Sequence, residues 1–195
     1  FSHTGAGGSN AGQRINAAGY SWSAAGENIS ASGTTDSNIN LTALITSQHA
    51  SLFRSAGHRR NILSSNYREL GIGQKKGVHI YPPNPGEYLS SMITQKFARS
   101  GSSYFVTGVI YNDGNSNNFY DVGEGLGGIT INVGGNSTNT NNSGAYSIAR
   151  SNGTYTVTVA GSAIPEPVSE EIIVSGSNIK FDVIVSGGSV SINTW

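Results

Sequence analysis

Three residues with side chains suited to metal binding or acid–base chemistry lie in unusual local contexts in the first third of the chain. They are His3 in "SHTG", Glu27 in "GENIS" and His58 in "SAGHRRNIL". Two imidazoles and one carboxylate are the smallest set that holds zinc with one coordination position open. The simpler interpretation is a solvated His3, a Glu27 that pairs locally and a His58 hydrogen-bonded at a helix start. Their wide spacing leaves both hypotheses open.

Ser55 suggests a second chemistry for the same residues. Ser55 and His58 stand at positions i and i+3, and Glu27 could orient the imidazole as the acid of a nucleophilic triad. No strained nucleophile elbow or oxyanion-hole sequence surrounds Ser55. The sequence Ser-Ala-Gly-His is more simply interpreted as a helix end followed by a tight turn.

The segment "DGNSNNFYDVGE" has the ligand spacing of a calcium-binding loop. Positions 1, 3, 5, 7, 9 and 12 are Asp113, Asn115, Asn117, Phe119, Asp121 and Glu124. Such a loop supplies short oxygen ligands at positions 1, 3 and 5, a backbone carbonyl at 7 and a bidentate glutamate at 12. The usual glycine at position 6 is Asn118, which tolerates a positive φ. With only three carboxylates, we expect weak calcium affinity; the alternative is an Asn/Gly-rich turn that binds nothing.

The elements that would position the first group of residues mix helical and strand patterns. A short helix is predicted over 10–19, where Asn10 and Gln13 can form a capping box. A longer helix is predicted from Asp36 to a stop at Gly57, because its apolar residues recur near a period of 3.6. A hairpin turning at Lys-Lys-Gly and a strand over 88–99 follow. We therefore predict an α+β arrangement for residues 1–100.

The pattern changes near "ARSGSSYF", after which only strand signals occur. Seven short runs rich in β-branched and aromatic residues are separated by Gly, Asn and Pro, from "YFVTGVIY" to "SVSINTW". This predicts an all-β antiparallel sandwich of the immunoglobulin or prealbumin type over residues 104–195. No helix signal follows the calcium loop, so an ion there would join one end of the sandwich.

Composition limits the partners and the compartment. The chain has 11 basic and 11 acidic residues, a formal net charge of zero and 27 glycines. Neutrality gives no electrostatic reason to expect nucleic acid, and no apolar run is long enough to span a membrane. The absence of cysteine excludes disulfides and thiolate metal sites. A surface solvated by amides and hydroxyls rather than by charges is typical of exported proteins.

Five motifs in the first half resemble, in order and spacing, the CAP superfamily of SCP-like extracellular domains in its bacterial form. They are "FSHTG", "RINAAGYSWSAAGENIS", "SAGHRRNIL", "ELGIG" and "MITQKF", which lie between residue 1 and about residue 98. The resemblance implies an α-β-α sandwich with a central cleft lined by His3, Glu27 and His58. It also implies that the two histidines can hold a divalent metal such as zinc.

The chain departs from this family at three places. The fourth cleft position, a glutamate in eukaryotic members, is Ser55, and a tryptophan usual in the family is Leu52. The family also opens with a helix before the first histidine, and this chain has none. We therefore expect either that residues upstream of Phe1 are missing or that another segment covers that side of the sheet.

The second half resembles the B-type repeats of bacterial surface adhesins and the related carboxypeptidase-regulatory-like sandwiches. The resemblance covers residues 104 to about 185 and implies a rigid stalk or spacer. Some relatives carry a Lys-Asn isopeptide cross-link that starts from a lysine in the first strand. Because "YFVTGVIY" contains no lysine, we do not expect that bond.

Together these features predict a secreted or cell-surface bacterial protein that acts as an extracellular binding or structural module. An unidentified extracellular ligand or surface component would be its partner, with a divalent metal or small ligand in the His/Glu cleft. One alternative is a metal-dependent peptidase or esterase, in which Glu27 activates a metal-bound water. The other is a structural subunit of a larger surface assembly.

Overall fold

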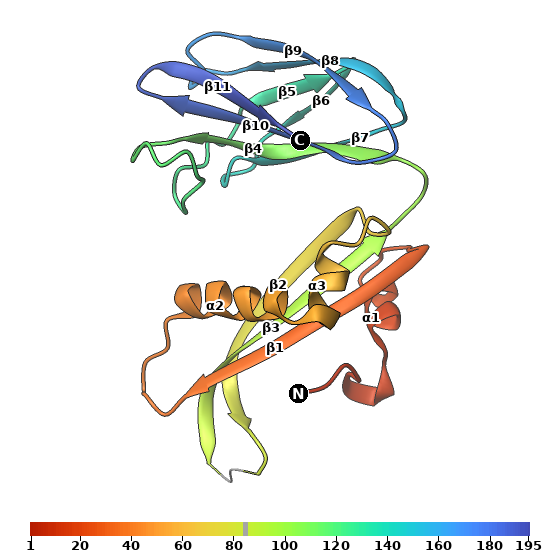
Figure 1. Ribbon diagram of the computed structural model, residues 1–195, viewed down its shortest axis with the longest axis vertical. Helices are drawn as coiled ribbons and strands as arrows, with labels where there is room; N and C mark the ends of the chain where they lie inside the picture. Colours follow the sequence, from red (N-terminus) through yellow and green to blue (C-terminus); the bar gives the residue numbers. More distant parts are fainter. Residues whose placement is uncertain (84–85) are drawn as a thin grey trace. The chain divides into compact units, whose positions relative to one another are not determined.

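The computed structural model describes residues 1–83 and 86–195, and the chain divides into two compact units (Figure 1). The first unit is Phe1–Gly101 and the second is Ser102–Trp195. The longest helix in the described part of the chain has 14 residues, and none there is long and apolar enough to cross a membrane.

The first unit combines one antiparallel sheet with short helices. Its elements are the 3-10 turn η1 (Ala6–Gly8), α1 (Ala11–Ala17), β1 (Ala24–Thr34), α2 (Leu41–Arg54), α3 (Ala56–Ile62), β2 (Glu69–Ile80) and β3 (Glu87–Arg99). The sheet order is β1-β3-β2, so the last strand lies in the middle. Register places Glu27 opposite Lys96 and Asn28 opposite Gln95, which brings residues from both ends of the unit together.

Local sequence explains where the helices begin. The Asn10 side chain accepts from the Gln13 backbone N–H, and the Gln13 side chain accepts from the Asn10 N–H, so the predicted capping box is confirmed. The second helix was predicted to start at Asp36, which is wrong. It begins at Leu41 because Asn40 caps it and accepts from the Ala43 N–H.

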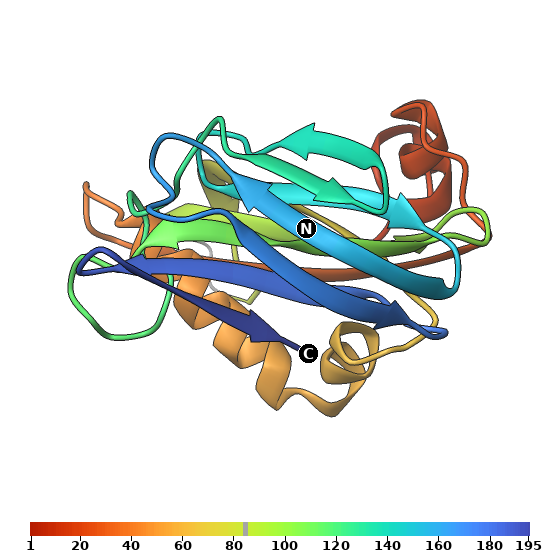
Figure 2. The same cartoon turned by 90° about the horizontal axis from the view of Figure 1, so that it is seen from above.

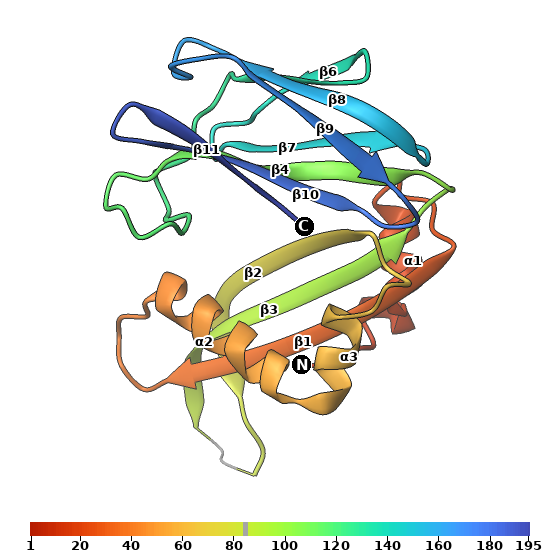
Figure 3. The ribbon, with the colours of Figure 1, turned by 45° about the horizontal axis from the view of Figure 1, so that its top comes forward.

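Helices lie on both faces of this sheet, but very unequally (Figure 3). Gln48 of α2 bonds Ser30 of β1, whereas Arg14 of α1 bonds Glu27 on the opposite face. Successive residues of a strand point to opposite faces, which explains this division. Helix α1 has only seven residues and contacts the sheet through β1. Among the described residues, most of the sheet face on which α1 lies therefore has no helical cover.

The predicted α+β fold with a CAP-type α-β-α sandwich is wrong. Strands contain 46% of the residues and helices 16%, and the strands form three sheets. The physical reason lies in the sheet face beside α1. It presents Glu27, Thr94, Lys96 and the glycines of β2 rather than a continuous apolar surface that a full helical layer could bury.

Two further predictions for this unit fail because strand pairing outweighs local turn signals. The Lys-Lys-Gly sequence was predicted to turn a hairpin, but Lys75, Lys76 and Gly77 lie inside the 12-residue strand β2. That strand pairs with β3 without interruption from Glu69 to Ile80. Gly57 does not stop a helix either, since α2 ends at Arg54 and Gly57 lies within α3.

The second unit is built from two four-stranded sheets. Its strands are β4 (Tyr104–Asn112), β5 (Thr130–Val133), β6 (Asn136–Asn139), β7 (Ala145–Arg150), β8 (Gly153–Ala160), β9 (Val168–Val174), β10 (Ile179–Ser186) and β11 (Ser189–Thr194). The sheet orders are β11-β10-β4-β7 and β6-β5-β8-β9. Figure 2 shows these strands from above. The predicted β-sandwich character is confirmed, whereas β10 and β4 pair in parallel rather than antiparallel.

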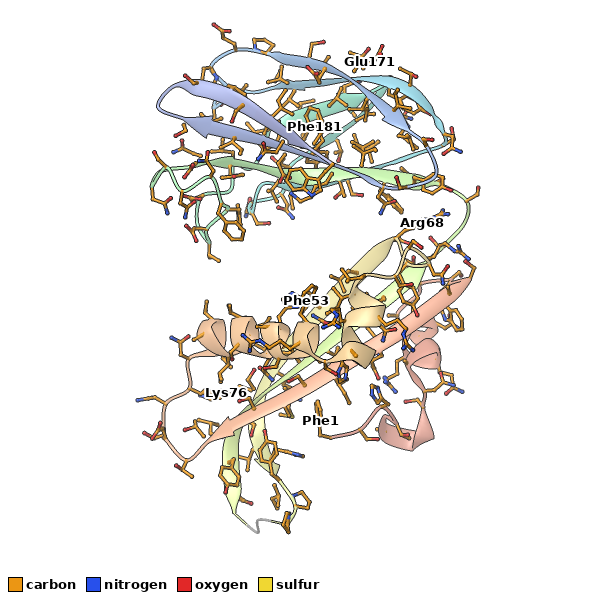
Figure 4. The ribbon with its side chains drawn as sticks, in the orientation of Figure 1. Phe1, Phe53, Arg68, Lys76, Glu171 and Phe181 are labelled. Carbon is orange, nitrogen blue, oxygen red and sulfur yellow. The ribbon has the colours of Figure 1, made fainter. Side chains whose placement is uncertain are left out.

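Alternating apolar side chains from both sheets fill the space between them. Eight of these side chains are 0% exposed: Val106, Ile110, Ile131, Val133, Val157, Val159, Phe181 and Val183. Phe181 is the largest of them and points into the interior of the unit (Figure 4). This core fixes the end of β4, from which the predicted calcium loop begins.

Candidate functional site

Glu27 is the centre of a charged cluster on the α1 face of the first sheet. His3 Nδ1 lies 2.8 Å from Glu27 Oε1, and Arg14 Nη2 donates to Glu27 Oε2 at 2.9 Å. The Lys96 ammonium donates to the same Oε2 from the paired position on β3. Arg14 also donates to the His3 carbonyl at 3.0 Å, which ties the first residues of the chain to α1. The predicted association of His3 with Glu27 is therefore present.

The electrostatics of this cluster keep Glu27 ionised. Burial alone would raise the pKa of the Glu27 carboxyl, because its side chain is only 5% exposed. Hydrogen bonds from Lys96, His3 and Arg14 outweigh burial and hold that pKa below its ordinary value. A carboxylate stabilised by two cations is a poor proton acceptor at neutral pH. The same positive neighbours reduce its attraction for a further cation.

His58 stands apart from this cluster in the described residues. Its Nδ1 lies 2.8 Å from Ser55 Oγ, at the first turn of α3. No hydrogen bond or ion pair in the described ranges joins His58 to His3 or Glu27. The structure thus contains the Ser55–His58 pair without the carboxylate needed to complete a triad. Residues 1–83 and 86–195 also contain no group of three or more His, Cys, Asp or Glu side chains arranged to hold a metal.

A buried amide network, which the sequence interpretation missed, supports α3 from the opposite face of β1. Asn28 is fully buried and donates to the His58 carbonyl at 3.1 Å and to Gln95 Oε1 at 3.1 Å. Asn61 donates to Asn28 Oδ1 at 2.9 Å. Gln95 continues the chain of contacts to His49, whose Nδ1 lies 2.9 Å from its amide nitrogen. The only sequence signal was that Asn28 directly follows Glu27 and so must face the other side of the strand.

Two grooves flank the ion pairs on the α1 face. One has a volume of about 490 Å³ and is lined by residues that include Phe1, Glu27, Met92, Thr94 and Lys96. The other, of about 520 Å³, is lined by residues that include Ile15, Tyr20, Glu69, Gly71 and Ala98. Arg14 and Lys96 border both. This face of the sheet therefore offers mainly apolar concave surfaces on either side of a neutralised carboxylate.

The predicted calcium loop lies in the second unit, between β4 and β5. Asp121 Oδ2 accepts from the side-chain amides of Asn115 at 2.8 Å and Asn117 at 2.9 Å. Glu124 Oε1 accepts from the Gly114 N–H at 3.1 Å, and Glu124 Oε2 accepts from the Asp121 N–H at 2.9 Å. Hydrogen bonds thus link the side chains at positions 3 and 5 to that at position 9, and the side chain at position 12 to the backbone of the same loop.

Asp113 anchors this loop to the sandwich. It is 3% exposed, its backbone N–H donates to the Val185 carbonyl at 2.8 Å, and its carboxylate accepts from Asn117 and Asn118. Asn118 has φ of 56°, so the predicted left-handed residue at position 6 is confirmed. The Phe119 side chain is 71% exposed, which fits a position that would contribute only its backbone carbonyl.

The residues present fit a hard cation. Carboxylate and amide oxygens are the main candidate ligands in the loop, and calcium requires no nitrogen or sulfur ligand. The two ends of the loop are held together by a hydrogen bond from the Asn112 N–H to the Glu124 carbonyl at 2.9 Å. The carboxylates now accept from N–H groups inside the loop. Calcium binding would require the side-chain amides of Asn115 and Asn117 to turn, so that their oxygens replace their nitrogens at the centre of the loop.

No family model matches the chain, and no curated protein matches it.

Proposed function

We propose that this protein is an extracellular binding and structural module whose second unit is a spacer stabilised by bound calcium. The observation that carries the proposal is the spacing of Asp113, Asp121 and Glu124 along one loop, in which two Asn amides donate to Asp121 and the sixth residue is left-handed. Calcium prefers six to eight oxygen ligands and accepts this flexible geometry. The small number of carboxylates supports weak affinity, which suits the millimolar calcium found outside cells.

Calcium would act here by neutralising repulsion and closing the end of the sandwich. Three carboxylates share one loop, and an ion at its centre would replace their mutual repulsion by attraction. The loop spans from the end of β4 to Gly125, which pairs with Tyr111 in an isolated bridge. Bound calcium would therefore stabilise the strand pairing at this end, and any force along the chain would meet a stiffer spacer.

For the first unit we propose ligand binding rather than hydrolysis. The grooves beside Glu27 can accept a ligand with apolar surface, and Arg14 and Lys96 border both of them. The hydrolase alternative would need Glu27 as a general base, but its lowered pKa and its separation from His58 both oppose that role. Zinc at His3 and His58 is the weaker of the two metal proposals, because His58 bonds Ser55 rather than Glu27, and Lys96 and Arg14 already neutralise the Glu27 carboxylate.

The family relationships remain predictions that the ordered motifs support. For the first half, the relationship to the CAP superfamily rests on sequence alone. For the second half, the proposed relationship to adhesin repeats is supported by the two four-stranded sheets. These resemblances and the composition are also what supports our proposal of secretion and of a role as a surface component.

Calorimetric titration with calcium tests the proposal. We expect binding at one site with a Kd between about 10⁻⁴ and 10⁻³ M. Glu124→Ala should abolish the heat of binding, whereas Glu171→Ala, which removes an exposed glutamate from β9, should leave it unchanged. Equal binding by the wild type and Glu124→Ala would place the calcium elsewhere and end the proposal for this loop.

A further inference from the structure

Strand β2 forms an outer edge of the first sheet (Figure 1). All 12 of its residues pair with β3 in one register, from Glu69 opposite Ala98 to Ile80 opposite Glu87. No other strand in the described part of the chain pairs with it. Natural sheet edges are usually blunted by proline, bulges, short strands or charged side chains, lysine above all. No proline or bulge interrupts β2, and the one such device at its centre is the pair Lys75 and Lys76. Apart from these two charges, its outer backbone groups offer a long template for another strand.

One face of this edge carries four exposed apolar side chains. They are Leu70 at 55%, Ile72 at 54%, Val78 at 60% and Ile80 at 47% exposure. Gln74 identifies the face, since its amide donates to the Leu41 carbonyl of α2 at 2.8 Å and to Ser91 Oγ at 2.9 Å. The alternate residues on the other face include Gly71, Gly73 and Gly77, which present no side chain that would obstruct an approaching strand.

The sequence of this edge is close to a palindrome about Lys75. In an antiparallel pair centred there, Leu70 would face Ile80 and Ile72 would face Val78 of the other strand. Gly73 would face Gly77 in the same register. Moving the centre by one residue, to Gln74 or Lys76, places lysine or glutamine opposite one of the apolar side chains. The register about Lys75 alone pairs all four apolar residues with one another, and such cross-strand pairs are the unit of sheet stabilisation.

We propose that two copies of this protein associate through β2, antiparallel and about a two-fold axis at Lys75, to form a continuous six-stranded sheet. The contact is isologous, because a residue that meets a second residue of the other copy is met in return by that copy's equivalent pair, and only Lys75 faces its own equivalent. Such a contact closes at two copies. The partner that fits the edge is a second copy of the chain. In the antiparallel register about Lys75, the apolar residues of one β2 face apolar residues of the other, and Gly73 faces Gly77.

Lys75 gives the association an unusual salt dependence. The two copies of Lys75 would lie directly opposite each other, and like charges in this position are destabilising. Salt screens such repulsion over a Debye length of about 8 Å at physiological ionic strength. We expect the dimer to tighten as salt rises, whereas an interface held by opposite charges would weaken.

Cysteine cross-linking tests the register, because the chain contains no cysteine of its own. Directly opposed residues have Cβ atoms about 4.5–5.5 Å apart, close enough for a disulfide with small adjustment. Under mild oxidation the full chain with Lys75→Cys should form a covalent dimer. Gly77→Cys alone should not, but a mixture of Gly73→Cys and Gly77→Cys chains should form a mixed dimer. Cross-linking of Gly77→Cys alone, or failure of Lys75→Cys to cross-link, would overturn the register.

Sedimentation velocity on the full chain tests the association without oxidation. We expect a concentration-dependent dimer that Lys75→Gln tightens by about fivefold and that Ile72→Lys abolishes while leaving the circular dichroism spectrum unchanged. Lys76→Gln is the matched control, since Lys76 would face Gln74 and its change should have a smaller effect. A chain that remains monomeric at all concentrations and salt levels would refute the proposal. This inference does not depend on calcium, so its failure would leave the proposed spacer role untouched.

Discussion

Glu27 shows how one carboxylate can be prevented from doing the chemistry that its neighbours suggest. Its position beside a histidine resembles an acid–base site. However, its side chain is 5% exposed and receives hydrogen bonds from Lys96, Arg14 and His3. These contacts favour the ionised form, so the residue contributes to stability and to the shape of the two grooves rather than to proton transfer.

The pH dependence of stability provides a test at the residue scale. Because the folded-state pKa of Glu27 lies below its ordinary value of 4.5, its contribution is complete above that value and is lost as pH falls through the lowered pKa. We expect Glu27→Gln to reduce the free energy of unfolding by about 2 kcal/mol at pH 7. The difference from the wild type should shrink as the pH falls below 4.5.

Chemical denaturation at several pH values would measure this difference. Glu87→Gln is the control, since Glu87 is exposed at the start of β3. A constant difference between wild type and Glu27→Gln from pH 7 to pH 3 would contradict the assigned role of the ion pairs.

The sequence made part of this site predictable. His3 and Glu27 were expected together from their motifs, and they are in contact. Arg14 and Lys96 were missed because they reach Glu27 from 13 and 69 residues away, through pairing that no local pattern reveals. The conformation of the predicted calcium loop was more accessible to prediction, because all its candidate ligands lie within one segment.

At the scale of elements, local signals determined some boundaries and strand pairing overrode others. The capping box at Asn10 and Gln13 was predictable because its hydrogen bonds are confined to one helical turn. Strand β1 was missed because "AAGENISASGT" is rich in Ala, Gly and Ser and is held by pairing with β3. Likewise β2 continues through Lys-Lys-Gly because β3 supplies a partner along its whole length.

The turn before β7 provides a test at this scale. Gly144 has φ of 78°, and a Cβ there would meet the Ile110 carbonyl of β4 beside Gly125. Gly176 has a similar φ of 82° but open space around its Cα. We expect Gly176→Ala to cost about 1 kcal/mol through backbone strain and Gly144→Ala to cost about 3 kcal/mol, because the clash adds to the strain.

Denaturant unfolding of the two variants would measure these costs. Because Gly144 lies beside the end of the proposed calcium loop, Gly144→Ala should also weaken calcium binding, whereas Gly176→Ala should not. Equal losses of stability for the two variants would mean that the close approach of β4 and the turn is absent.

At the scale of the whole molecule, the two units differ in what holds them together. The second unit has a core of buried apolar side chains between two sheets, and the first relies on one sheet, short helices and buried polar networks. The division near residue 101 follows the change of periodicity in the sequence. What periodicity could not supply was the parallel pairing of β4 with β10, which joins segments far apart in the chain.

The most direct test of the central claim is thermal unfolding of the full chain with and without calcium. We expect two transitions, because each unit has its own sheets and contacts. Calcium at ten times its Kd should stabilise the second unit by about 1.4 kcal/mol and raise only that unit's transition temperature. The same experiment with Glu124→Ala should show no shift. If calcium leaves both transitions of the wild type unchanged, the proposal that calcium stabilises the second unit is contradicted.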